Sequence, residues 1–200
     1  CNHCSAFNIC MVAWLVKIYF MNIEELFLEA EADIKKNAHV DALRKYETIL
    51  YDVPTHAPTH NSLGWIYKTQ FDDYKKAEVH FRAAIKSDPN YPHPYFHYAV
   101  LLTDMERYDE LKKHLHYCLT IPTIEKSWVY YRYAIVEELN MNFDEAIGYF
   151  EKAMLNSLND EKIKEYQADI DRCRKKIEII INHKEWQDKK NQEENNVLNI

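Results

Sequence analysis

The chain has 200 residues, a formal net charge of −7 and only two glycines. An acidic chain lacks the positive face that general nucleic-acid binding needs, and so few glycines argue against a protein of strands and tight turns. Five cysteines with scattered spacing are a poor basis for a disulfide framework, so we expect a reducing, cytoplasmic setting.

The first 21 residues differ in composition from the remainder. The apolar run 11–21, interrupted by Lys17, is too short to span a bilayer. It lacks a basic segment before it and a small-residue cleavage site after it. We predict that residues 1–21 are a leader or upstream extension outside the folded part. The alternative is an anchored or exported protein, with residues 1–20 as the remnant of a targeting signal.

Four residues near the N-terminus have the side chains of a zinc site, but the second close pair of ligands is missing, so neither metal nor cofactor is predicted. The four residues are Cys1, His3, Cys4 and Cys10.

Beyond residue 21, three series of residues recur with a period of about 34. Two series are mostly small and one is bulky, as two antiparallel helices per repeat require for close packing. The series are Ala30, Gly64, Ala99 and Ala134; Ala42, Ala77, Leu111 and Ala146; and Tyr46, Phe81, Leu115 and Phe150.

The period predicts pairs of helices. Prolines at 54, 89 and 122 fall where the chain must turn between repeats. We predict first helices near 22–36, 57–69, 92–105 and 125–140, and second helices near 39–52, 73–87, 108–120 and 143–156.

The sequence pattern in the final part of the chain predicts one longer helix, near 160–186. Its apolar residues recur at steps of three and four, from Ile163 to Ile181, with polar residues between them. Such a helix suits the exposed end of a repeat array. The polar tail 187–200 is expected to be frayed.

This pattern resembles the tetratricopeptide repeat family. The second repeat carries the best match and the fourth the next best. The matching residues are Leu63, Gly64, Tyr67, Tyr74, Ala77, Phe81, Ala84, Asp88 and Pro89, then Phe143, Asp144, Glu145, Ala146, Phe150 and Ala153.

The resemblance implies an all-α, right-handed superhelical solenoid. We expect about four helix-turn-helix repeats over 22–158, with a C-terminal capping helix over 159–186 and a tail over 187–200. The repeats are 22–56, 57–91, 92–126 and 127–158.

No catalytic motif stands out, so we predict that the chain is not an enzyme. His93 and His97 are four residues apart, a spacing that can hold a metal, but no third ligand accompanies them. We expect a surface or groove histidine pair without metal. Glu137 and Glu138 are expected to lie on a solvated face.

In the family that the chain resembles, first helices line a concave groove. The positions that face inward map here to Phe27, Glu31, Ile34, Asn61, Trp65, Lys68, His93, Phe96, His97, Val100, Trp128, Tyr131, Arg132 and Ile135. Tryptophan, tyrosine and arginine dominate binding hot spots, so this row predicts a site for a peptide or protein segment. The alternative is that some of these aromatic side chains pack against neighbouring segments.

Some family members clamp a C-terminal carboxylate with lysine, arginine and asparagine side chains. The corresponding positions here are occupied by Phe27, Glu31, Ser62, His93 and His97, so that clamp is not expected. The resemblance therefore implies a non-catalytic adaptor or scaffold that binds a protein or peptide, not nucleic acid. Two alternatives stay open: a secretion-type client chaperone, and a structural protein that self-associates through Ile177, Ile181 and Trp186.

Overall fold

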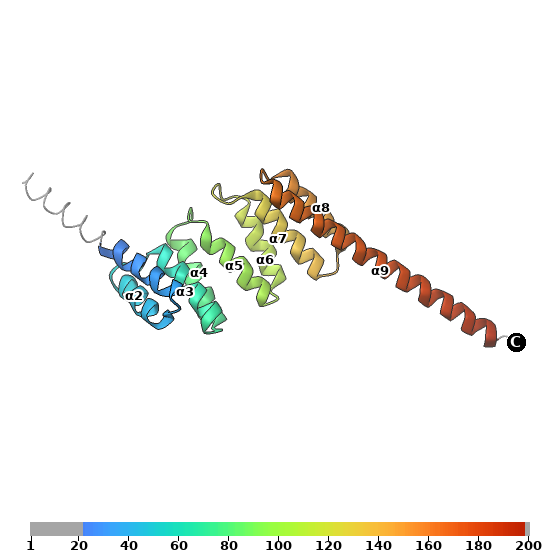
Figure 1. Cartoon of the computed structure of the whole chain (residues 1–200), viewed down its shortest axis with the longest axis horizontal. Helices are drawn as coiled ribbons and strands as arrows, with labels where there is room; N and C mark the ends of the chain where they lie inside the picture. Colours follow the sequence, from blue (N-terminus) through green and yellow to red (C-terminus); the bar gives the residue numbers. More distant parts are fainter. Residues whose placement is uncertain (1–21, 199–200) are drawn as a thin grey trace, which may run out of the picture. The chain divides into compact units, whose positions relative to one another are not determined.

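A computed structural model describes residues 22–198, with side chains from 22 to 191. The predicted leader and the zinc-type residues lie outside the described residues. All the regular elements of the described part are α-helices, so the all-α prediction is confirmed (Figure 1). Residues 22–35 are helical, and they are followed by α2 (His39–Asp52), α3 (Ala57–Gln70), α4 (Tyr74–Ser87), α5 (His93–Asp104), α6 (Tyr108–Cys118), α7 (Lys126–Leu139), α8 (Phe143–Leu155) and α9 (Asp160–Leu198).

Helix bounds up to residue 155 agree with the predicted ones within two residues, and the end of α9 does not. This helix continues past Trp186 to Leu198, where a frayed tail was predicted. Six of the twelve residues 187–198 are glutamine, lysine or glutamate, which favour helix, and the stretch has neither proline nor glycine to end the helix. Polarity alone was therefore a poor signal for fraying.

The chain divides after Asp104 into two compact units. Unit 1 contains residues 22–35 and α2 to α5, and unit 2 contains α6 to α9. The boundary falls between α5 and α6, inside the predicted third repeat 92–126. The division of 22–158 into four equivalent repeats stays a prediction.

The three periodic series form the centre of both units. Every described member of the series is buried, and all of them except Gly64 have an exposed fraction of 0 %. Gly64 shows why one position must be small. A Cβ atom built on it would lie 2.6 Å from Cδ1 and Cε1 of Phe81, inside the van der Waals contact distance. The absence of a side chain on α3 is what lets the Phe81 ring of α4 pack against it.

A left-handed residue follows the first helix of each predicted pair, and none of the four is glycine. The φ angles are 58° at Asn37, 50° at Asp72, 56° at Glu106 and 63° at Met141. Two of these turns are closed by backbone bonds from Ala38 N to Asp33 O at 2.9 Å and from Asn142 N to Glu137 O at 2.8 Å. After α3, the corresponding bond runs from Asp73 N to Tyr67 O at 2.9 Å.

Each unit has its own apolar cluster. In unit 1, the helix 22–35 packs with α2 and α3 around Ala30, Tyr46, Ile49 and Ile66. In unit 2, α7 and α8 pack with the first part of α9 around Phe143, Phe150, Ile170 and Cys173. The later part of α9 extends past α7 and α8 (Figure 1), and every side chain from 181 to 191 is exposed.

Candidate functional site

One pocket of about 220 Å³ lies in unit 1, between three successive first helices. Glu31 and Ile34 come from the helix 22–35, one turn apart. Asn61, Ser62 and Trp65 come from the first half of α3, and His97 comes from α5. The lining residues are Glu31, Ile34, Asn61, Ser62, Trp65 and His97. All except Ser62 belong to the row of residues that the sequence assigns to the groove.

A single carboxylate is fixed at this pocket by two hydroxyl groups. Tyr46 Oη donates to Glu31 Oε1 at 2.5 Å, and Ser62 Oγ donates to the same oxygen at 2.6 Å. Tyr46 is fully buried on α2, and burial together with the nearby Glu31 carboxylate raises its pKa, so the phenol keeps its proton. The sequence identified Tyr46 only as a packing residue.

A neutral polar pair forms another wall. Asn61 is only 7 % exposed, and its Oδ1 lies 2.9 Å from His97 Nδ1. Burial lowers the pKa of His97, and the nearby His93 and Lys68 lower it further. The His97 imidazole is therefore neutral at neutral pH and adds no positive charge to the pocket.

Five predicted groove residues of unit 1 do not line the pocket: Phe27, Lys68, His93, Phe96 and Val100. Lys68 is mostly buried and forms an ion pair with Asp104, with Nζ 2.6 Å from Oδ2. His93 is exposed on α5, and its ring lies 6.4 Å from that of Phe96. His93 and His97 therefore have different surroundings, and His97 bonds to Asn61.

The predicted groove residues of unit 2 are on α7, and two of them pack toward α9. Tyr131 stacks on Tyr166 with ring centroids 5.1 Å apart and also contacts Phe150. Ile135 packs against the same apolar cluster. Trp128 and Arg132 are partly buried on α7. For Tyr131 and Ile135, packing against a neighbouring helix is thus an observed role.

The prediction that Glu137 and Glu138 are solvated is wrong. Their exposed fractions are 7 % and 8 %. Glu138 accepts from Arg172 at 2.8 and 2.5 Å and from Lys176 at 2.7 Å, both on α9. These cations, with the hydrogen bonds they donate, lower the pKa of the Glu138 carboxyl against the opposing effect of burial. The sequence of α7 alone does not show that a later helix covers this face.

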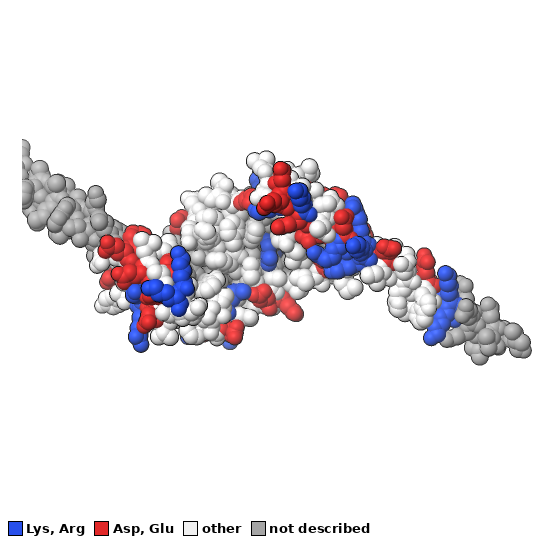
Figure 2. Space-filling model, viewed as in Figure 1, with Lys and Arg blue, Asp and Glu red and all other residues white. Residues whose placement is uncertain are grey.

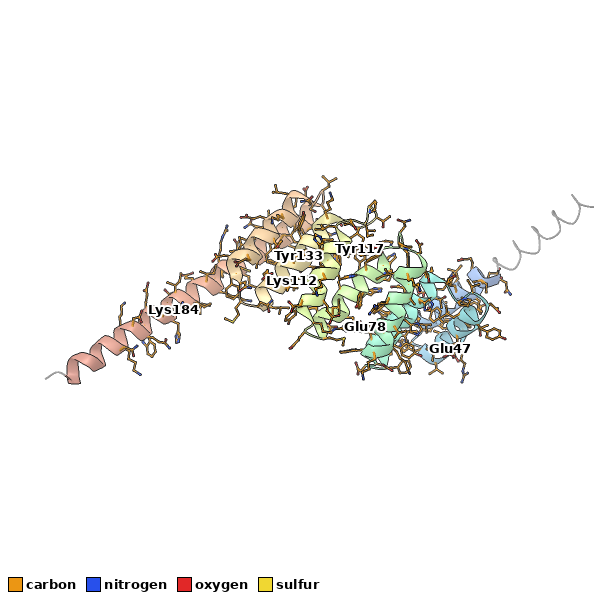
Figure 3. The ribbon with its side chains drawn as sticks, turned by 180° about the vertical axis from the view of Figure 1, so that it is seen from behind. Glu47, Glu78, Lys112, Tyr117, Tyr133 and Lys184 are labelled. Carbon is orange, nitrogen blue, oxygen red and sulfur yellow. The ribbon has the colours of Figure 1, made fainter. Side chains whose placement is uncertain are left out.

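Glu137 makes a matching pair on the other side of α7. Its Oε1 lies 2.7 Å from Lys112 Nζ, and Asn142 Nδ2 donates to its Oε2 at 2.9 Å. Lys112 and Tyr133 lie against each other in Figure 3, where the Tyr133 hydroxyl donates to the Lys112 carbonyl at 2.9 Å. The buried carboxylates of unit 2 are therefore each held by at least one cation.

A histidine contact in unit 1 was missed by sequence analysis. His60 Nδ1 lies 3.0 Å from His80 Nδ1, across α3 and α4. Tyr67 stacks on the His80 ring at 5.4 Å. Burial, followed by the proximity of His60 and Lys76, lowers the pKa of His80 to about 4. Twenty residues separate the two histidines, so no local spacing indicated this contact.

Two further properties concern residues 22–198 as a whole. No group of three or more His, Cys, Asp or Glu side chains there is placed to hold a metal ion. No helix of this described part is both long and apolar enough to cross a membrane. Acidic and basic side chains are interspersed on the visible face of both units (Figure 2).

Comparison with known proteins identifies the repeat. Residues 57–91 match the tetratricopeptide repeat family model. The chain is similar in structure to PilF of Pseudomonas aeruginosa, with a TM-score of 0.63 and 20 % identity over 77 % of this chain and 69 % of that one. No curated protein sequence matches the chain.

Two other solved structures are similar over most of their length. A thermophilic tetratricopeptide protein of Thermus thermophilus gives a TM-score of 0.58 at 16 % identity, over 73 % of this chain and 80 % of that one. PilW, described as a type IV pilus biogenesis factor, gives 0.56 at 18 % identity, over 74 % and 76 %. The family match over residues 57–91 and the shared fold together support the resemblance: the chain contains a tetratricopeptide repeat and has the all-α solenoid fold of these structures.

Proposed function

We propose that this chain is a non-catalytic interaction scaffold that binds a peptide or protein segment along its first helices. One observation carries the proposal: residues far apart in the sequence, on three first helices, converge on one pocket. The pocket combines a large aromatic side chain, Trp65, with fixed polar groups at Glu31 and Asn61. That combination is typical of sites that anchor a side chain of a partner.

The fold supports binding in preference to catalysis. Tetratricopeptide repeats present an extended surface to a protein or peptide, and a similar fold occurs in a protein described as a pilus biogenesis factor. The predicted groove residues of α7, with Arg132 foremost, are proposed to form a separate binding surface of unit 2, since Tyr131 and Ile135 already pack against its apolar cluster. A chaperone for a client segment would use the same residues.

The test is capture of a partner by the full chain and by two matched variants. Trp65→Ala removes a large aromatic group from the pocket, and we expect it to weaken binding by about 1–3 kcal/mol. Tyr51→Ala is the control, because Tyr51 is a large aromatic residue that is 86 % exposed on α2. A captured protein counts only if its affinity, measured by calorimetric titration, falls with Trp65→Ala and not with Tyr51→Ala. Equal affinities for the two variants would move the site away from the pocket.

Self-association through α9 is the second candidate function. Ile179, Ile181 and Trp186 are 67 %, 50 % and 58 % exposed on this helix. Large apolar side chains left exposed on one helix are candidates for an interface with a second copy of the chain. Light scattering across a range of protein concentrations tests this candidate. A mass that rises with concentration for the natural chain and stays constant for Ile181→Glu supports it, and a constant monomer mass for both contradicts it.

A further inference from the structure

We propose that the pocket in unit 1 accepts a basic side chain, lysine or arginine, of the bound segment. This inference rests on the proposed function and adds the chemistry of the partner. It starts from the one charged group that lines the pocket, the carboxylate of Glu31.

The Glu31 carboxylate is oriented without being neutralised. Both of its hydroxyl partners, on Tyr46 and Ser62, donate to Oε1. Among the described residues, no side chain forms a hydrogen bond or ion pair with Oε2. A hydroxyl group supplies a hydrogen bond but no net charge. The pocket therefore holds a fixed negative charge with one oxygen left for a donor from a ligand.

Two lysines of unit 1 are engaged in ion pairs with other carboxylates. Lys68 pairs with Asp104 at 2.6 Å, and Lys45 pairs with Asp33 at 2.8 Å. His97, which does line the pocket, bonds to Asn61 and is neutral at neutral pH because burial lowers its pKa. None of these three groups cancels the charge of Glu31 from inside the pocket.

The other walls suit the stem of a basic side chain. Lysine and arginine bury their methylene groups against apolar surface while their charged ends reach a polar partner. Ile34 and Trp65 supply apolar surface here, and the face of an indole ring attracts a cation. A volume of about 220 Å³ is that of a side chain, not of a folded element. A carboxylate ligand would instead be repelled by Glu31.

The first experiment compares small probes on the full natural chain. The probes are Nα-acetyl-lysine amide, Nα-acetyl-arginine amide, Nα-acetyl-norleucine amide and Nα-acetyl-glutamate amide. The readout is the NMR signal of the Trp65 indole N–H, assigned with Trp65→Phe. We expect saturable shifts with the two basic probes and about tenfold weaker binding of norleucine, which has the apolar stem without the charge. Equal binding of lysine and norleucine, or tighter binding of glutamate, would overturn the proposal.

The second experiment removes the charge with a matched control. Glu31→Gln keeps an oxygen that can accept from Tyr46 and Ser62 and loses the negative charge. Glu29→Gln removes the same charge from the same helix at a residue that pairs with Lys45 and does not line the pocket. We expect lysine binding to fall about tenfold in Glu31→Gln and to stay unchanged in Glu29→Gln. Unchanged binding in Glu31→Gln contradicts the proposal, and the probe comparison on the natural chain does not depend on how this variant folds.

The two proposals fail in different ways. If a captured partner is lost with Trp65→Ala but retained at full affinity by Glu31→Gln, the scaffold function stands and the basic-side-chain inference is wrong. If a captured partner is retained by both variants while the lysine probe still binds at Trp65, the proposed function is wrong and the cation pocket stands.

Discussion

Units 1 and 2 use the same packing pattern and bury different polar chemistry. Both place small residues against bulky ones at equivalent positions, with exposed fractions of 0 % at Ala42, Tyr46, Ala146 and Phe150. In unit 1, the polar groups that line the pocket are the carboxylate of Glu31, the amide of Asn61, the hydroxyl of Ser62 and the imidazole of His97. In unit 2, two buried carboxylates are neutralised by cations from α6 and α9.

The difference shows that the same helix packing can either cover a buried carboxylate with a later helix or leave one at a pocket. In unit 2, α9 lies over α7 and fills its polar positions with Arg172 and Lys176, so that the carboxylate of Glu138 works as a structural group. In unit 1, the Glu31 carboxylate lines a pocket and forms no ion pair with a cation of residues 22–104. A packing pattern shared by the two units therefore positions the helices, and the remaining side chains determine whether a polar position is covered by another helix or lines a pocket.

The largest expected loss of stability comes from a substitution at Gly64, which disrupts the packing that both units share. Gly64→Leu would place a side chain where Phe81 already lies 2.6 Å from a built Cβ atom. Overpacking of this kind costs on the order of 1–3 kcal/mol or more. The control is Gly148→Ala in α8, where a Cβ atom meets nothing within 4 Å, and which should stabilise by about 0.5–1 kcal/mol through helix propensity. Urea unfolding followed by circular dichroism measures both, and an unchanged midpoint for Gly64→Leu would contradict the contact.

The next effect concerns the buried ion pairs of unit 2. Glu138→Gln leaves Arg172 and Lys176 beside a neutral amide, and we expect a loss of about 1–2 kcal/mol, because both cations are partly solvated. Asp171→Asn is the control, since it removes an ion pair with Arg174 in which both side chains are more than half exposed. Such surface pairs contribute close to zero. Equal unfolding free energies for both variants would show that burial of Glu138 has no energetic consequence.

Much of this comparison could be predicted from the sequence, and the missing parts share one physical cause. Helix positions and the buried series follow from local periodicity, and five of the six pocket residues follow from their positions on first helices. The bonds from Tyr46 and Ser62 to Glu31 span 15 and 31 residues, and the pairs of Glu138 span 34 and 38. Side-chain partners at such separations depend on how helices pack, which no local pattern contains.

A pH change should separate the two units. The folded-state pKa values of His56, His80 and His97 are lowered, chiefly by burial, and that of His80 falls to about 4. Their contribution to stability is full above the unfolded pKa near 6.5 and is lost as the pH falls toward 4, because the unfolded chain binds protons first. We expect a loss of about 1 kcal/mol between pH 7 and pH 5, a modest value because His80 is partly solvated.

The carboxylates of unit 2 respond in a lower window. The pKa values of Glu137 and Glu138 are lowered, so their contribution is full above the ordinary value of 4.5 and is lost as the pH falls below it. Between pH 7 and pH 5, the free energy of unfolding measured in urea should therefore depend less on pH in His80→Gln, which cannot titrate at this position, than in the natural chain. The same pH dependence should be unchanged in Glu138→Gln. An unchanged pH dependence in His80→Gln, together with a reduced one in Glu138→Gln, would contradict the difference between the units.

The smallest expected effect is a gain in stability at the turn between α7 and α8. Met141 has a φ of 63° and its side chain is 65 % exposed, so it bears the steric cost of the left-handed region with little packing in return. Met141→Gly should stabilise by about 0.5–1 kcal/mol, since the steric relief exceeds the entropy that glycine adds to the unfolded chain. Asn37→Gly is the matched control in unit 1: its φ is 58°, but asparagine adopts this region readily, so a change near zero is expected. If the two substitutions shift the urea midpoint equally, the cost at Met141 does not come from its backbone angle, and the turns of the two units are energetically alike.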